Sequence, residues 1–169
     1  MKCTSSEANK LLRTLETKRN SIQQREVKAA SFVISVGENI EEVRPEYDFR
    51  KTQDEIAELN KKIRTVKHAI NRFNVSHSVP GFDMTIDQVL VYLPQLSERV
   101  NKLKSMADTL PRERVESFRM NTAEYSIANY DPKEVEGEYN KAQEELHALQ
   151  LALDVINSSE TMDIDIVIY

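Results

Sequence analysis

The sequence predicts a mainly α-helical protein, a four-helix bundle of two pseudo-repeated antiparallel helical hairpins with a small β component. Glycine and proline are scarce, with 3 and 5 residues among 169, and charged residues make up 30%. Few turn-forming residues together with many charged ones are typical of long amphipathic helices. Apolar residues also recur at helical spacing in four segments, and the second and fourth of these segments resemble each other.

The first two helices are predicted from capping residues and apolar stripes. Thr4–Glu7 forms a capping box, in which a hydroxyl and a carboxylate satisfy free backbone N–H groups at a helix start. Asp48 caps a second helix that we expect to extend to about Asn74. Intervals of three, four and seven place the apolar side chains on one face. They are Ala8, Leu11, Leu12, Leu15, Ile22 and Ala29 in the first helix, and Ile56, Leu59, Ile63, Val66, Ala69 or Ile70, and Phe73 in the second.

The other two helices begin at similar signals. Thr85–Gln88 is a second capping box, and the helix after it contains Pro94, where we expect a kink or a restart. Asp131 followed by Pro132 is a strong start for the fourth helix, which we expect to end near Asn157. The apolar stripes are Val89, Leu90, Leu93, Leu96, Val100, Leu103 and Ala107, and then Val135, Tyr139, Ala142, Leu146, Leu149, Leu153 and Ile156.

Three short segments carry strand signals. Phe32–Val36 is rich in β-branched residues, Tyr125–Ala128 follows an aperiodic stretch, and the tail Met162–Tyr169 alternates between apolar and acidic residues. The first two lie in the hairpin connections. Because a lone strand leaves its backbone groups unsatisfied, we expect the tail to pair with one of the other two strands or with the same segment of a second copy.

An internal duplication is predicted from an offset of 83 positions. This offset aligns Tyr47–Ser76 with Tyr130–Ser159 without a gap, and six of the 30 pairs are identical. We therefore expect one helical domain over residues 1–169 with pseudo-repeats at about 5–79 and 85–160, followed by a C-terminal strand at 162–169. The alternative is that both halves are generic amphipathic helices.

Three segments together resemble the septicolysin-like family of small bacterial helical proteins. They are Ala69–Asn74 at a helix end, the threonine-led helix start Thr85–Leu90, and Leu103–Asp108. The resemblance implies a bacterial helical bundle of unknown biochemical role. We transfer no cytolytic activity, because no segment has the pattern of a membrane-seeking amphipathic helix.

Candidate chemistry is sparse. Glu144 and His147 have the Glu-x-x-His spacing of carboxylate-bridged metal sites, but no second such pair exists, so we expect a surface histidine and no bound metal. Cys3 is the single cysteine, and 3 glycines cannot build a phosphate-binding loop. We expect no catalytic residue and no cofactor. Asn74 and Asn157 are candidate binding positions across the pseudo-symmetry axis, and the alternative is that both end their helices in the left-handed conformation.

The remaining properties favour an interaction protein over an enzyme. The net charge of −5 and the pI of about 5.3 argue against nucleic-acid binding. No apolar run is long enough to span a membrane, so we expect a cytoplasmic protein. We expect a non-enzymatic structural or interaction protein that forms a homo-oligomer, and the alternative is a module that binds a partner helix or small ligand in the bundle. The expected oligomer contact lies in the tail, at Ile164, Ile166 and Ile168, and the alternative is that the tail folds back on its own bundle and the protein is monomeric.

Overall fold

A computed structural model describes residues 1–115 and 123–166 of the chain, and helix makes up 67% of these residues. The mainly helical fold with small antiparallel sheets is therefore confirmed. In chain order the elements are β1 (Lys2–Thr4), α1 (Ser5–Ala29), α2 (Ile40–Val43), α3 (Phe49–Ser76), α4 (Ile86–Ala107), β2 (Arg112–Val115), β3 (Glu124–Ile127), α5 (Pro132–Ser159) and β4 (Thr161–Asp163).

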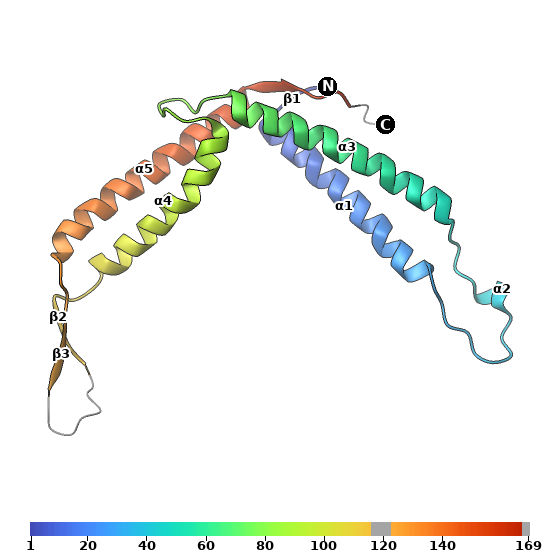
Figure 1. The fold of residues 1–169 in the computed structure, drawn as a ribbon, viewed down its shortest axis with the longest axis horizontal. Helices are drawn as coiled ribbons and strands as arrows, with labels where there is room; N and C mark the ends of the chain where they lie inside the picture. The colour runs from blue at the N-terminus through green and yellow to red at the C-terminus, as the bar shows by residue number, and fades with distance from the viewer. Residues whose placement is uncertain (116–122, 167–169) are drawn as a thin grey trace. The chain divides into compact units, whose positions relative to one another are not determined.

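The chain divides into two compact units, where the sequence analysis expected one helical domain. Unit 1 comprises Met1–Asn74 and Asn157–Tyr169, and unit 2 comprises Val75–Ile156. Each unit contains one antiparallel helical hairpin, α1 with α3 in unit 1 and α4 with α5 in unit 2 (Figure 1). Each hairpin buries its own apolar stripe, so each unit has a core of its own.

The hairpin of unit 1 follows the sequence prediction closely. Thr4 caps α1 as expected, because its hydroxyl accepts from the Glu7 amide at 3.2 Å while the Glu7 carboxylate accepts from the Thr4 amide at 2.8 Å. Every apolar position predicted for α3 is buried, and so are Ala8, Leu15 and Ile22 of α1. An ion pair of 2.8 Å between Lys67 and Glu16 joins the two helices at their polar edge.

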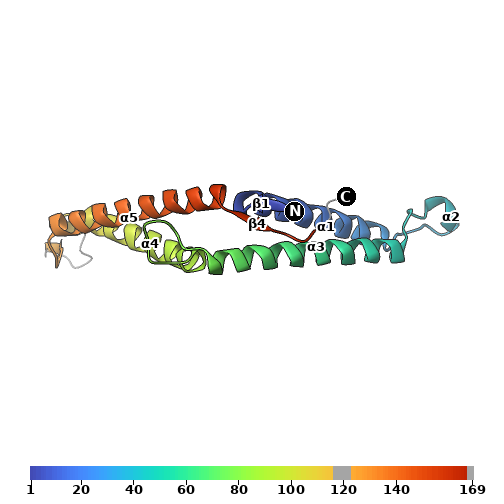
Figure 2. The ribbon, with the colours of Figure 1, turned by 90° about the horizontal axis from the view of Figure 1, so that it is seen from above.

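The tail pairs with the N-terminus of its own chain. β4 runs antiparallel to β1, with Cys3 opposite Met162 (Figure 2). Beyond the strand, the Met1 amino group donates to the Ile164 carbonyl at 2.7 Å, and the Ile164 amide donates to the Met1 carbonyl at 2.8 Å. The partner of the tail within the chain is therefore Lys2–Thr4 and neither Phe32–Val36 nor Tyr125–Ala128. A three-residue segment without a strand pattern was not expected to pair. The strand is also shorter than predicted, since residues 164–166 are not strand and 167–169 lie outside the described part.

Unit 2 repeats the arrangement with α4 and α5. The Thr85 capping box is present, with Gln88 as its second member, and α4 continues through Pro94 without the expected restart. Val89, Leu96 and Val100 are buried on α4, as are five positions of α5, namely Val135, Ala142, Leu149, Leu153 and Ile156. The Tyr92 hydroxyl donates to the Glu145 carboxylate at 2.7 Å and links the two helices.

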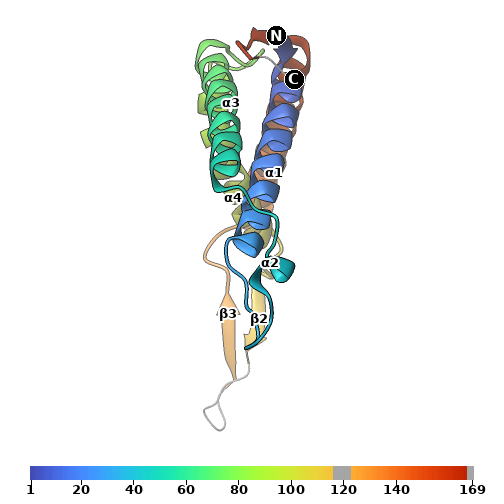
Figure 3. The same cartoon turned by 90° about the vertical axis from the view of Figure 1, so that its right-hand side faces the viewer.

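The two hairpin connections differ. In unit 2, β2 and β3 form an antiparallel ribbon (Figure 3), and the Arg112 guanidinium lies 3.8 Å from the centre of the Tyr125 ring. The strand predicted at Tyr125–Ala128 is thus confirmed with a shift of one residue. The strand predicted at Phe32–Val36 in unit 1 was wrong, because this extended segment has no partner strand among the described residues.

Candidate functional site

The end of the unit 1 hairpin carries an elaborated connection, residues 30–48, which we name the unit 1 tip. It contains the short helix α2, whose first turn is capped by the Asn39 side chain, and Arg44 forms an ion pair of 2.8 Å with Glu41. Figure 3 shows the tip continuing beyond the ends of α1 and α3. The acidic residues Glu38, Glu41, Glu42 and Glu46 give it a negative charge.

Residues 31–35 of the tip form an extended segment with exposed apolar side chains. Val33 is 96% exposed, and Phe32 and Ile34 on either side of it are also exposed. A turn ends the segment, in which the Glu38 amide donates to the Ser35 carbonyl at 3.1 Å and Gly37 has φ of +97°. This positive φ is one that glycine adopts without steric cost. The turn leaves Val36 fully exposed.

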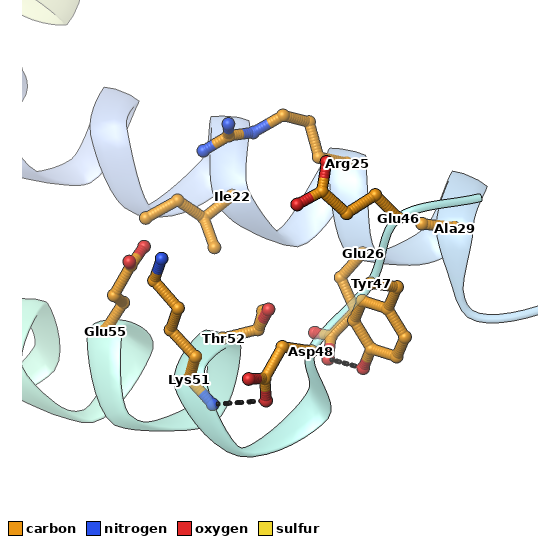
Figure 4. A pocket seen from close by; sticks show the side chains of 10 residues that line it. All are labelled: Ile22, Arg25, Glu26, Ala29, Glu46, Tyr47, Asp48, Lys51, Thr52 and Glu55. Atoms are coloured by element: carbon orange, nitrogen blue, oxygen red, sulfur yellow. Dashed lines mark hydrogen bonds between the residues drawn. The ribbon is translucent and has the colours of Figure 1, made fainter.

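Beneath the tip, a pocket of about 380 Å³ opens between the end of α1 and the start of α3 (Figure 4). Ile22 forms its apolar floor, and cationic and anionic side chains stand around it. The lining residues are Ile22, Arg25, Glu26, Ala29, Glu46, Tyr47, Asp48, Lys51, Thr52 and Glu55. A second hollow between the same helices shares Ile22, Lys51 and Glu55 with this pocket, so the two are neighbours along unit 1.

Hydrogen bonds at the pocket anchor the tip to α1. The Glu26 carboxylate accepts from the Tyr47 hydroxyl at 2.7 Å and from the Gln53 side-chain amide at 2.6 Å. Asp48 accepts from the Lys51 amide at 3.0 Å and thereby caps α3, as the sequence predicted. The bond to Glu26 favours the neutral phenol and raises the pKa of Tyr47 above its usual value.

The lining of the pocket is mostly charged and polar. Its titratable groups are carboxylates, an arginine, a lysine and one tyrosine that already donates to Glu26. No serine or cysteine nucleophile beside a base lines it. Among residues 1–115 and 123–166, no three histidine, cysteine, aspartate or glutamate side chains gather as a metal ion would require. No described helix is long and apolar enough to cross a membrane.

The residues singled out in the sequence do not converge on this pocket. Asn74 and Asn157 are half-buried and lie within α3 and α5, two residues before each helix ends, so neither is the left-handed terminal residue of the alternative interpretation. His147 is exposed on α5. Ile164 is buried in its own chain and Ile166 is half-buried, while Ile168 lies outside the described residues.

The tip was not among the sites predicted from the sequence. Its signal was present in Phe32–Val36, whose strand-like composition was interpreted as part of a folded sheet. An apolar run next to an acidic segment, within a connection, is also the pattern of an exposed contact surface.

Comparison with known proteins establishes the fold. No protein-family model matches the chain, and no curated protein matches it. The chain is similar to a crystal structure of a functionally unknown conserved protein from Corynebacterium diphtheriae, with a TM-score of 0.67 and 18% sequence identity. The match covers 96% of this chain and 100% of that chain. At this identity the two proteins share a fold, and the likeness carries no information on function.

The Tyr47–Glu26 bond has a measurable consequence in alkali. We expect Tyr47 to ionise above the usual pKa of about 10, so the ultraviolet difference titration between wild type and Tyr47→Phe should have its midpoint above pH 10. A pKa raised by folding contributes stability that is present below pH 10 and is lost as the pH rises through the folded value.

Glu26→Gln is the control for this titration, because it removes the negative charge and keeps the side chain's size. In that background the Tyr47 midpoint should return toward its ordinary value. A midpoint at or below pH 10 in the wild-type protein would show that the bond does not form.

Proposed function

We propose that the chain is a non-enzymatic structural or interaction protein that self-associates. The observation that carries the proposal is the apolar surface of the unit 1 tip. Six large apolar side chains are exposed within twelve consecutive residues, namely Phe32, Val33, Ile34, Val36, Ile40 and Val43. Single exposed apolar residues are ordinary, but a cluster of this kind marks a contact surface.

The rigid setting of the tip supports the same proposal. The Tyr47–Glu26–Gln53 network fixes one end of the tip to α1, and the Asp48 cap fixes the start of α3. A contact surface held in one conformation loses less conformational entropy on association than a free loop does. The network therefore favours a defined contact over indiscriminate aggregation.

We further propose that the chain arose by duplication of one helical hairpin, so that its four long helices form two pseudo-repeated hairpins. Burial supports the duplication, because four of the five buried residues of α5 fall on buried residues of α3 at the offset of 83. The pairs are Leu59 with Ala142, Val66 with Leu149, Ile70 with Leu153, and Phe73 with Ile156.

Two aligned tyrosines give independent support for the duplication. Tyr47 donates to Glu26 near the end of α1 at 2.7 Å, and Tyr130 donates to the Met106 carbonyl near the end of α4 at 3.1 Å. The aspartate after each tyrosine accepts from an amide in the first turn of the following helix. The same two residue types thus perform the same two tasks in both hairpins.

The proposal includes membership of the septicolysin-like family and a cytoplasmic location. It also includes the absence of nucleic-acid partners, cofactors and enzymatic activity. They rest on the sequence patterns given above. Asn74 and Asn157 remain candidate binding positions, and both belong to unit 1 at the points where the chain passes from one unit to the other.

A second candidate function is the binding of a small polar ligand in the pocket beneath the tip. Its volume of about 380 Å³ lies within the range of small-molecule sites. The lining offers both cationic and anionic side chains, so it would suit a ligand that carries a positive and a negative charge. The cations are Arg25 and Lys51, and the anions are Glu46, Asp48 and Glu55.

Light scattering coupled to gel filtration tests self-association directly. We expect the full chain to have a mass that is a multiple of 19.5 kDa, decreasing toward one chain on dilution. A mass of one chain at every concentration up to the millimolar range would refute the proposal.

A further inference from the structure

We propose that the unit 1 tip binds the tip of a second copy, through antiparallel pairing of the extended segments Ser31–Ser35 about a two-fold axis at Val33. This inference rests on the self-association proposed above and specifies the surface that carries it. The occupant of the apolar tip is therefore the same tip of another chain.

The backbone at the centre of the extended segment is free to pair, whereas at its end the Ser35 amide donates to the Glu38 carboxylate at 2.7 Å and the Ser35 carbonyl accepts from the Glu38 amide at 3.1 Å. Phe32, Val33 and Ile34 take part in no hydrogen bond with another described residue. Their composition favours a strand, and an exposed extended segment with free N–H and C=O groups is a template for pairing with another chain. The sequence pattern indicates a strand, but the described part of the chain contains no partner strand for it. Pairing with a second copy would supply that partner.

Antiparallel pairing about Val33 is favoured by the charges at the two ends of the segment. The exposed cations Arg25 and Lys28 precede it, and Glu38, Glu41 and Glu42 follow it, of which Glu41 is paired with Arg44. In the two-fold arrangement the basic end of each copy lies beside the acidic end of the other. A parallel arrangement would instead bring like charges together, which destabilises pairing.

The exposed apolar area reaches the size of a small dimer interface when the contact covers nearly all of it. Judged from their exposed fractions, the six apolar side chains of the tip present on the order of 600 Å² per chain, so a symmetric contact would bury at most about 1,200 Å², the lower bound for stable specific interfaces. A two-fold contact also closes on itself, so it limits assembly to a dimer.

The tail is a weaker candidate for this contact. Ile164 is 1% exposed and its backbone is bonded to Met1, while β4 is paired with β1. Its main apolar side chain is thus occupied within the monomer, and the tip offers the larger free surface.

Cysteine cross-linking tests the register. Residues opposite each other in an antiparallel pair have Cα atoms about 4.5–5.5 Å apart, within the range that a disulfide spans. In a Cys3→Ala background, we expect Val33→Cys to yield a disulfide-linked dimer on mild oxidation. The matched control is Val27→Cys. Val27 is also an exposed valine, but it lies on α1 outside the segment, so this variant should yield no disulfide-linked dimer. No cross-link at Val33, or equal cross-linking at both positions, would overturn the inference.

Charge insertion tests the contact by a second route. We expect Val33→Asp with Val36→Asp to reduce the association constant by about a hundredfold or more, because two valines per chain that the proposed contact covers become charged. Val91→Asp changes an exposed valine on α4, outside the tip, and should leave the mass unchanged. A monomeric wild type would defeat the proposed function itself. An oligomer that persists in the double variant would defeat only the assignment to the tip.

Discussion

Leu149→Ala is expected to lower the free energy of unfolding of unit 2 by about 2–5 kcal/mol, the range for removal of a large buried side chain. Leu149 is fully buried on α5, with 0% exposure, among the apolar side chains that join α5 to α4. The substitution removes the transfer free energy of the lost atoms and leaves a cavity, and a two-helix unit has little further core to compensate.

The matched control lies two residues further along the same helix. Leu151 is 53% exposed, so Leu151→Ala makes the same chemical change with little loss of buried area. Both variants should be unfolded in urea and followed by circular dichroism at 222 nm. We expect a large shift of the midpoint for Leu149→Ala and a small one for Leu151→Ala.

The two units allow a sharper form of this prediction. Because each has its own core, Leu149→Ala should increase amide hydrogen exchange in α4 and α5 while leaving α1 and α3 close to the wild type. An equal loss of protection in all four helices would mean that the chain unfolds as a single cooperative unit, against the division into two cores.

The four long helices were predictable because their signals are local. The Thr4 and Thr85 capping boxes, the Asp48 and Asp131 caps and the apolar intervals lie within a few residues of each other along the chain. The burial of every predicted α3 stripe position shows how strongly a 3.6-residue period determines a helix and its buried face.

The strands were less predictable, because pairing depends on residues far apart in the sequence. Phe32–Val36 has a strand composition but found no partner, so it remained an extended segment. The opposite case is Lys2–Thr4, which has no distinctive strand pattern and yet pairs with Thr161–Asp163. Strand propensity describes the fit of side chains to a sheet and does not identify the neighbouring strand.

The candidate site could be predicted only in part for the same reason. Asp48 was recognised as a cap, but the bond from Tyr47 to Glu26 joins residues 21 positions apart and has no sequence signature. The apolar side chains of Phe32–Val36 are exposed because this segment has no partner strand among the described residues. Within the tip, the sequence therefore marked only Phe32–Val36, which was predicted as a paired strand and is instead an exposed segment.

Removal of the tail is expected to expose the single cysteine of the protein. Cys3 is 4% exposed in β1, opposite Met162 of β4, and burial raises the pKa of its thiol above the usual value. Glu7 and Asp163 raise the pKa further, since their negative charges disfavour the thiolate. Both effects slow the reaction with a disulfide reagent, because the thiolate is the reactive form.

A chain ending at Ser159 lacks β4 and the bonds between Ile164 and Met1, so β1 loses its partner strand. We expect its thiol to react at least about tenfold faster than that of the full chain, because local opening no longer requires the sheet to separate. Circular dichroism should show that the four long helices persist in the shortened chain.

Two point variants separate the role of the tail's packing from that of its presence. Ile164→Ala removes a side chain that is 1% exposed and should accelerate the thiol reaction, whereas Ile166→Ala alters a half-buried neighbour and should change the rate little. Equal rates for the full and shortened chains would mean that β1 and the start of α1 cover Cys3 without β4. Faster reaction of the shortened chain and of Ile164→Ala, but not of Ile166→Ala, would establish that the two chain ends close unit 1 by pairing with each other.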